Sequence, residues 1–263
     1  SGPMTAVGYY FGKKLREGLG IPVGIIHSSL GGSEIAAWLP REVINANNSF
    51  RTLRGNHWLD SPLISDWVRG RARKNISPRL NQGSPDHPYK PAFLYESGIA
   101  WTTPLPITGV IWYQGESNAG RAYQYRTIFP AMIKDWRADW AQGDFHFYFV
   151  QLANFMDRKE EPLADDTWAE LREAQFLTLS LPATGMASAI DIGEAKDIHP
   201  KNKQEVARRL AVISLADTYG QKIPAQAPVY DDYTVENGKV RISFTIPAIG
   251  ERFEQNKDIK GFT

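Results

Sequence analysis

The pattern of apolar and polar positions along the chain switches between helical and strand-like periods. Four segments carry apolar residues at helical spacing and are predicted to be amphipathic helices: residues 4–19, 121–140, 167–179 and 201–218. Four short apolar runs are predicted to be buried strands: residues 21–27, 110–113, 145–152 and 185–190. Strands that alternate with helices in this way indicate an α/β fold with a largely parallel sheet and helices on both faces.

Two other segments have a different pattern. Residues 41–90 are rich in Arg, Asn, Ser, Pro and Gly, and we expect a loop-rich insertion there, a candidate lid over a site. Residues 229–233 and 239–246 are strand-like and are joined through Glu236-Asn237-Gly238, which predicts a β-hairpin. We therefore expect a main domain over residues 1–222 and a C-terminal β segment over residues 223–263.

Composition narrows the classes of partner. The chain has 30 basic and 29 acidic residues, so no charge bias favours nucleic acid or an anionic membrane. It has no cysteine, and therefore neither a thiolate nucleophile nor a thiolate metal site. No run reaches the roughly 18 to 20 apolar residues of a membrane span. We expect neither a nucleic-acid partner nor membrane insertion, and the sequence leaves the oligomeric state open.

Three clusters of polar and small residues follow predicted strands: Ser28–Ser33, Gln114–Asn118 and Asp191–His199. The carboxyl ends of parallel strands meet at one edge of a sheet, which is where open α/β sheets bind their ligands. The sequence therefore predicts that the three clusters converge on one site.

Each cluster contains candidates with an alternative structural role. Paired glycines such as Gly31-Gly32 let a backbone amide approach a ligand, as an oxyanion site requires, but they also occur in tight turns. Ser117 and Asn118 could simply cap the next helix. His199 has Asp197 two residues earlier and is either a catalytic base or a structural histidine. Trp38 is either a core anchor or a platform for a sugar.

Together these segments resemble a known family, the sialate O-acetylesterases among the SGNH-type carbohydrate esterases. The segments that carry the resemblance are Trp112–Asn118, Ser28–Ser33 with Trp38, and Asp197–Gln204, and the similarity runs from Thr5–Gly12 to the hairpin. The resemblance implies a flavodoxin-like three-layer fold. It also implies hydrolysis of acetyl esters on sugars, sialic acid among them, by a serine, a histidine and a carboxylate, without metal or cofactor. A secreted or periplasmic location is implied as well.

The resemblance also suggests roles for individual residues. His199 would be the general base. Asp197 is favoured as the carboxylate that orients it, and Glu116 remains open because related esterases use the corresponding glutamate. The oxyanion-hole and substrate-binding candidates are Gly31, Gly32, Gln114 and Asn118.

One feature of the family is not found in these residues. Family members carry the nucleophilic serine in a Gly-Gln-Ser-Asn-type loop, upstream of the segment that matches Thr5, and no such loop occurs in the 263 residues. Ser117 lies in a later block, where the family's serine is not the nucleophile. We therefore expect the chain to lack the nucleophile block and the first strand, and to be a poor catalyst by itself. The alternatives are a non-catalytic carbohydrate-binding protein and an SGNH esterase or lipase of other specificity.

Overall fold

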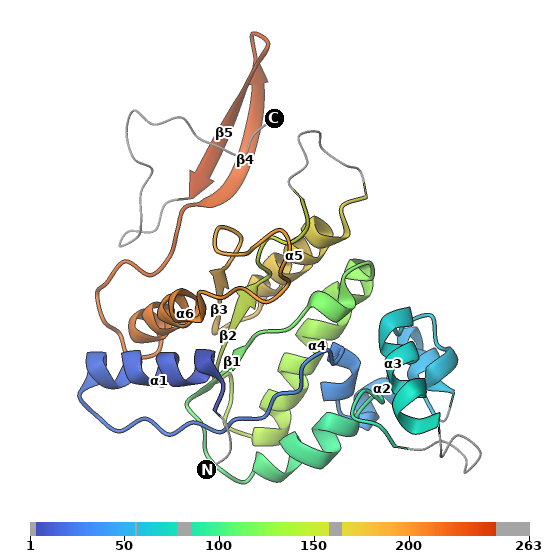
Figure 1. Cartoon of the computed structure of the whole chain (residues 1–263). Helices are drawn as coiled ribbons and strands as arrows, with labels where there is room; N and C mark the ends of the chain where they lie inside the picture. Colours follow the sequence, from blue (N-terminus) through green and yellow to red (C-terminus); the bar gives the residue numbers. More distant parts are fainter. Residues whose placement is uncertain (1–3, 56, 78–85, 158–164, 246–263) are drawn as a thin grey trace. The chain divides into compact units, whose positions relative to one another are not determined.

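The fold is mixed α/β, and the computed structural model describes residues 4–55, 57–77, 86–157 and 165–245 (Figure 1). The α-helices are α1 (Ala6–Leu19), α2 (Arg41–Ala46), α3 (Asp66–Ile76), α4 (Ala122–Trp140), α5 (Thr167–Leu177) and α6 (Lys203–Asp217). The strands are β1 (Gly109–Trp112), β2 (His146–Gln151), β3 (Thr184–Ser188), β4 (Val229–Glu236) and β5 (Lys239–Thr245). Short 3₁₀ turns include Ile35–Trp38, Asn48–Leu53, Trp58–Asp60 and Glu116–Asn118.

Three strands form a parallel sheet in the order β1-β2-β3, which confirms the predicted parallel arrangement. Gly109 is opposite His146, and Phe147 is opposite Thr184. Four consecutive residues of β2, from Phe147 to Val150, are buried, so both faces of this strand are covered. Continuous burial of this kind is typical of a central parallel strand.

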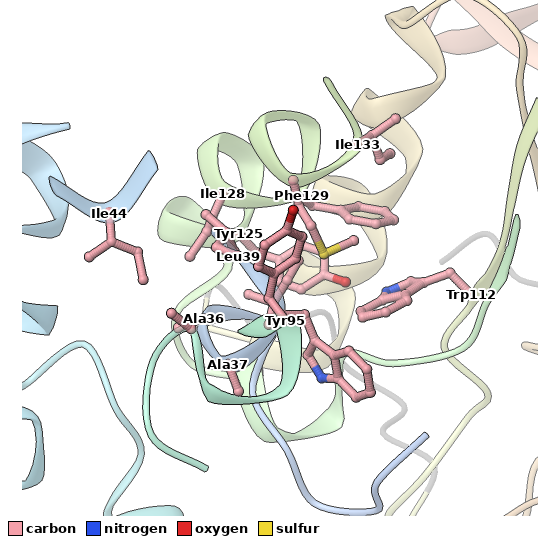
Figure 2. Close-up of a cluster of buried hydrophobic side chains, with 14 of the residues drawn as sticks. Ala36, Ala37, Leu39, Ile44, Tyr95, Trp112, Tyr125, Ile128, Phe129 and Ile133 are labelled. Atoms are coloured by element: carbon pink, nitrogen blue, oxygen red, sulfur yellow. The ribbon is translucent and has the colours of Figure 1, made fainter. Parts of the chain in front are cut away.

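An aromatic core joins the sheet to α4. Trp112 at the end of β1 packs edge-on against Trp38 and Trp136, with ring centroids 5.5 and 5.8 Å apart, and it also contacts Phe129. Figure 2 shows Trp112, Phe129 and Tyr125 within this cluster. Trp38 is buried here, so of its two predicted roles the structure supports the core anchor. In Figure 1, α4 runs between the sheet and the region that carries α2 and α3.

Side-chain caps fix where three helices begin. Ser65 Oγ accepts from the amide of Val68 at the start of α3. Asp166 Oδ1 accepts from the amides of Trp168 and Ala169 at the start of α5, and the Asn202 side chain caps α6 in the same way. Such caps satisfy amides that have no partner within the helix, and each typically stabilises it by about 1 kcal/mol.

The segment predicted to be a loop-rich insertion is more regular than its composition suggests. It contains α2 and α3, and its apolar residues Phe50, Trp58 and Val68 are buried in the main core. Helical turns form because these residues have a large hydrophobic surface to pack against. Residues 56 and 78–85 of this segment lie outside the described residues, and the role of a lid stays a prediction.

The chain divides into two compact units, and each is described by itself. One comprises Ile26–Met156 and Leu163–Pro200 and contains the parallel sheet with α2 to α5. The other comprises Ser1–Ile25, Asp157–Pro162 and Lys201–Thr263. In this second unit α1 and α6 pack through a small cluster formed by Leu15, Ala211 and Leu215. The predicted domain boundary after residue 222 stays a prediction.

The β4–β5 hairpin is antiparallel, as predicted, and it belongs to the second unit. Asn237 and Gly238 both have positive φ angles, 51° and 72°, which is the conformation that a two-residue hairpin turn requires. Residues 246–263 of the predicted C-terminal segment lie outside the described residues.

The strand predicted over residues 21–27 is wrong. No strand forms there, and Ile21 and Ile26 are half exposed. An apolar run forms a strand only where a neighbouring backbone offers hydrogen-bond partners. In the part of the chain that the structure describes, β1 pairs with β2 alone, and no strand pairs with residues 21–27.

In the described ranges, no helix combines the length and the apolar composition that a membrane span needs.

Candidate functional site

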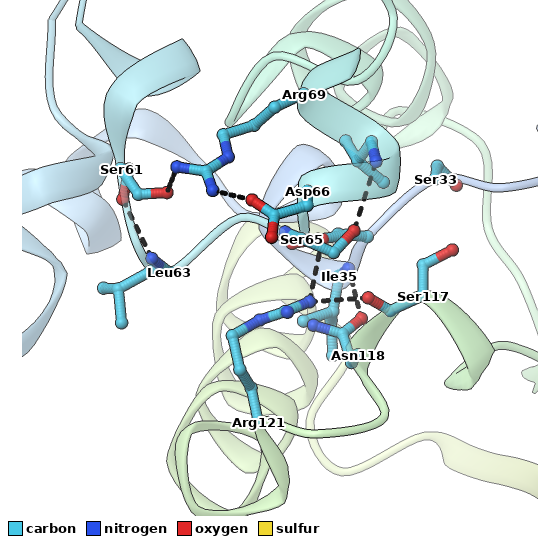
Figure 3. Close-up of polar contacts among 12 residues, drawn as sticks. Ser33, Ile35, Ser61, Leu63, Ser65, Asp66, Arg69, Ser117, Asn118 and Arg121 are labelled. Atoms are coloured by element: carbon cyan, nitrogen blue, oxygen red, sulfur yellow. Dashed lines mark hydrogen bonds and ion pairs between the residues drawn. The ribbon is translucent and has the colours of Figure 1, made fainter. Parts of the chain in front are cut away.

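Two of the three polar clusters meet in the unit that contains the sheet. The amide of Ile35 donates to Asn118 Oδ1 at 3.1 Å (Figure 3), and Ser117 Oγ donates to the carbonyl of Gly32 at 3.1 Å. These contacts join the glycine loop, Ser28–Ser33, to the loop that follows β1, Gln114–Asn118, across more than 80 residues of sequence. The predicted convergence of these two clusters is confirmed, although the first does not follow a strand.

Gln114 joins the two loops from within the core. Its side-chain nitrogen Nε2 donates to the carbonyl of Ser33 at 3.2 Å and to Asn118 Oδ1 at 2.7 Å. Its side-chain oxygen accepts from the hydroxyl of Tyr125, and its backbone carbonyl accepts from the side chain of Gln175. Both hydrogens of the Gln114 amide are therefore used inside the protein. Asn118 uses its oxygen in these contacts, and its side chain is buried.

The glycine loop has its carbonyls fixed. Tyr89 Oη donates to the carbonyl of Gly31 at 3.1 Å, and the carbonyl of Gly32 accepts from Ser117. Neither glycine amide donates a hydrogen bond within the described part of the chain, so both amides remain possible oxyanion donors. Gly32 has a φ of 75°, and a Cβ at this position would lie 2.8 Å from both Trp67 and Tyr89. Only glycine fits this position without displacing those rings.

A buried ion pair supports both loops. Glu34 is 0% exposed, and its Oε1 accepts from the amide of Ser65 at 2.6 Å and from Arg121 at 2.8 Å. Arg121 also donates to the carbonyl of Ser117, and Figure 3 shows its side chain extending from the start of α4 to this loop. Burial raises the pKa of Glu34, and the positive charge of Arg121 opposes that rise.

Sequence reasoning missed Glu34 and Arg121. One signal was present, because a lone carboxylate opens the otherwise apolar run from Ile35 to Leu39. A charge in such a run needs a buried partner, but the sequence does not say that this partner lies 87 residues away.

The third cluster carries the histidine and follows β3. Asp197 Oδ1 accepts from the backbone amide of His199 at 2.9 Å and lies 3.7 Å from its Nδ1, while the imidazole is 83% exposed. Within the described residues, no hydrogen bond or ion pair links His199 to the glycine loop or to Gln114–Asn118. The structure thus brings two clusters into direct contact and holds the third, in the same unit, as an exposed Asp-His pair.

A close backbone contact fixes the histidine loop to the segment after β2. A Cβ on Gly193 would lie only 2.2 Å from the backbone oxygen of Asn154. The amide of Met156 also donates to the carbonyl of Ala195 at 2.9 Å. These contacts determine where the loop that carries Asp197 and His199 can lie.

The two remaining candidates are Glu116 and His27. Glu116 begins the 3₁₀ turn Glu116–Asn118, and burial together with the charge of Glu116 raises the pKa of Tyr113. His27 Nε2 lies 2.6 Å from Ser29 Oγ at an exposed position. His27 is thus an exposed imidazole beside a hydroxyl, and it is the rival of His199 for the role of base.

This chemistry suits acyl transfer. An imidazole with a carboxylate beside Nδ1 presents Nε2 for proton transfer, and free glycine amides can bind a developing oxyanion. Within the described part of the chain, no three His, Asp or Glu side chains cluster in a way that could hold a metal ion.

Comparisons with known proteins point to one family. Residues 64–216 match the family described as carbohydrate esterase, sialic acid-specific acetylesterase. The sialate O-acetylesterases of Mus musculus and Homo sapiens are each 31% identical to the chain over 241 and 237 residues, which is 83% of the chain. The chain spans only 43% and 40% of these two relatives.

A solved structure is similar as well. The crystal structure of a carbohydrate acetylesterase from Xanthomonas citri is 36% identical and superimposes with a TM-score of 0.68. The similarity covers 93% of this chain and 48% of the bacterial one.

Proposed function

Since the chain belongs to the family of sialic acid-specific carbohydrate acetylesterases, we propose that it hydrolyses acetyl esters on sugars through a serine, His199 and a carboxylate. The observation that carries this proposal is the Asp197–His199 pair. One ring nitrogen faces a carboxylate and the rest of the imidazole is open, which is the arrangement that a general base needs.

In the proposed mechanism a serine oxygen attacks the acetyl carbonyl while His199 Nε2 takes the hydroxyl proton. The tetrahedral oxyanion accepts hydrogen bonds from the amides of Gly31 and Gly32 and from Nδ2 of Asn118. When the intermediate collapses, His199 returns the proton to the departing sugar oxygen, and the acetyl group remains on the serine. Water then attacks this acyl-enzyme with His199 again acting as the base.

Gln114 has a different part in the proposal. Because both of its amide hydrogens are used internally, it positions the two loops and does not itself bind the oxyanion.

The attacking serine is proposed to lie outside the residues that the structure describes. Ser117 Oγ donates to the carbonyl of Gly32, and Ser33 Oγ donates to the carbonyl of Leu30 and accepts from Trp38. Ser29 contacts His27. Among the described residues, no serine hydroxyl forms a hydrogen bond with His199. A carbohydrate-binding protein without turnover is the second candidate, and this observation is what favours it.

The finer assignments belong to the same proposal. An O-acetylated sialic acid as the substrate rests on the names of the relatives, and the 9-O position rests on the family resemblance. A secreted or periplasmic location rests on the family alone.

The test is acetate release from 9-O-acetyl-N-acetylneuraminic acid by the full-length product of the gene. Replacing His199 with Ala should lower kcat by at least about a hundredfold, because removal of a general base does so. Replacing His27 with Ala should leave kcat within about threefold of the parent. Near-parental turnover without His199, or the larger loss without His27, would overturn the assignment. Binding of the sugar without acetate release would favour the second candidate.

A further inference from the structure

The tryptophans of this chain divide into two groups. Six are buried in the core: Trp38, Trp58, Trp112, Trp136, Trp140 and Trp168. The other two are Trp67, which is 60% exposed, and Trp101, which is 78% exposed. Isolated exposed aromatic residues are ordinary on protein surfaces, so exposure alone says nothing about function. What distinguishes Trp67 from Trp101 is where its ring lies.

The Trp67 ring lies directly against the glycine loop. A Cβ on Gly32 would be 2.8 and 2.9 Å from two carbons of the Trp67 six-membered ring. The ring of Tyr89 is 6.2 Å from that of Trp67, and the hydroxyl of Tyr89 donates to the carbonyl of Gly31. The backbone that is proposed to bind the acetyl oxyanion is therefore bordered by an exposed indole.

The backbone that carries Trp67 is held by several neighbouring contacts. It lies in the first turn of α3, next to the cap that Ser65 provides, and the amide of Ser65 donates to the buried carboxylate of Glu34. Two residues beyond Trp67, Arg69 pairs with Asp66 and donates to the carbonyl of Ser61 (Figure 3). A side chain on such a framework loses little freedom when a ligand binds to it, which favours affinity.

We propose that Trp67 is a stacking platform for the pyranose ring of the substrate, adjoining the point where the acetyl group is held. Pyranose rings present several C–H groups on one face, and these pack against the electron-rich face of an indole. An exposed tryptophan on a capped helix turn, beside the proposed oxyanion loop, has the chemistry to select esters on sugars over other acetyl esters. This inference rests on the proposed function, because it identifies the part of the site that recognises the sugar.

The test compares two substrates on the full-length product of the gene. The sugar probe is the methyl glycoside of 9-O-acetyl-N-acetylneuraminic acid, and the probe without a ring is methyl acetate. Trp67→Ala should lower kcat/KM for the sugar probe about three- to tenfold more than it lowers kcat/KM for methyl acetate. Trp67→Phe should retain part of the preference, because it keeps an aromatic face.

Two further variants isolate the aromatic contribution. Trp67→Leu keeps apolar bulk against Gly32 but has no aromatic face, so it should behave like Trp67→Ala and serves in its place if that variant does not fold. Trp101→Ala removes another exposed tryptophan, which belongs to the turn Ala100–Thr102. This variant should leave kcat/KM unchanged for both substrates. Equal losses on both substrates would overturn the proposal, because they would mean that Trp67 only supports the loop. Unchanged kinetics on both substrates would overturn it as well.

Failure of the proposed function has a separate signature. If the parent releases acetate from neither probe, hydrolysis is disproved and the platform is judged by binding alone. Isothermal titration of the same glycoside should then show binding to the parent and to Trp101→Ala, and about three- to tenfold weaker binding to Trp67→Ala. Equal binding to all three proteins would overturn the platform independently of catalysis.

Discussion

At the scale of single residues, the ion pair between Glu34 and Arg121 is the contact whose loss should be most damaging. Removing one partner of a buried pair leaves an uncompensated charge and typically destabilises a protein by about 3 to 5 kcal/mol. Arg121→Ala should therefore lower the free energy of unfolding by about 3 kcal/mol at pH 7.5, as measured by urea denaturation.

The pH dependence of the same variant follows from the raised pKa of Glu34. Without Arg121 nothing opposes the effect of burial, so the pKa of Glu34 rises further in the folded state and stays ordinary in the unfolded state. The folded state of the variant then binds more protons at Glu34 than the unfolded state does. The contribution of Glu34 to the free energy of unfolding therefore increases as the pH falls towards the ordinary pKa of a glutamate. We expect the deficit of the variant to be smaller at pH 5 than at pH 7.5.

Arg126 on the same helix provides the matched control. It pairs with Glu173 at the surface, and an exposed pair of this kind is worth roughly 0 to 1 kcal/mol. If Arg121→Ala and Arg126→Ala destabilise equally, or if the Arg121 deficit is the same at both pH values, the supporting role of Glu34 is refuted.

A second prediction concerns the carboxylate that orients His199. Asp197 lies 3.7 Å from Nδ1 and also accepts from the backbone amide, so it is the better placed of the two candidates. In the full-length product of the gene, Asp197→Asn should reduce kcat far more than Glu116→Gln, because an orienting carboxylate fixes the tautomer and stabilises the imidazolium. The reverse ranking would assign the role to Glu116, and equal mild effects would exclude both.

The sequence identified several residues of the two loops, but the pattern of apolar and polar positions did not show which residues form hydrogen bonds or ion pairs with them. Asn118 and Gly32 were flagged by type and position. The role of Gln114 depends on Tyr125 and Gln175, and that of Glu34 on Arg121, and these partners come together only when the core packs. Trp67 was not singled out within the predicted insertion, because the exposure of a side chain depends on neighbours that are distant in sequence.

At the scale of elements, periodicity predicted the helices and strands that bury a strong apolar face, including α4, β2 and α6. It failed at residues 21–27, where apolar character is present but a neighbouring strand is not. Strand formation depends on the neighbour as much as on the run itself, so this error could not have been avoided from local sequence.

A third prediction concerns the loop that follows β3. Gly193→Ala would place a methyl group 2.2 Å from the backbone oxygen of Asn154, so the loop must move. We expect a loss of about 1 to 3 kcal/mol in the free energy of unfolding, as for other overpacked sites. Because Asp197 and His199 lie on the same loop, kcat should fall as well.

Two substitutions test whether the crowded backbone is the cause. Gly24→Ala should change neither stability nor kcat, because a Cβ there meets nothing within 4 Å. Asn154→Ala should not rescue Gly193→Ala, because the nearest obstructing atom belongs to the backbone. Normal stability and turnover of Gly193→Ala would show that the contact does not position the histidine.

At the scale of the whole molecule, the family match covers only part of the candidate site. The match over residues 64–216 includes the loop after β1 and the Asp-His pair, while the glycine loop lies before it. The chain spans less than half of the two curated relatives, so the activity of the whole protein is a matter for experiment. The parallel sheet and the hairpin could be predicted from periodicity, because each depends on apolar pattern and turn chemistry that are local in sequence.

The last prediction is that residues 1–263 by themselves release acetate from methyl acetate little faster than the uncatalysed reaction does. Acyl transfer requires a hydroxyl within roughly 3 Å of the base, and the structure shows Ser29, Ser33 and Ser117 in hydrogen bonds with groups other than His199. The mouse sialate O-acetylesterase is the positive control for a sugar assay run in parallel. A fluorophosphonate should leave the 263-residue chain unlabelled. If that chain instead releases acetate rapidly and the inhibitor labels Ser117, then Ser117 is the nucleophile, and its hydrogen bond to Gly32 must break before it can attack.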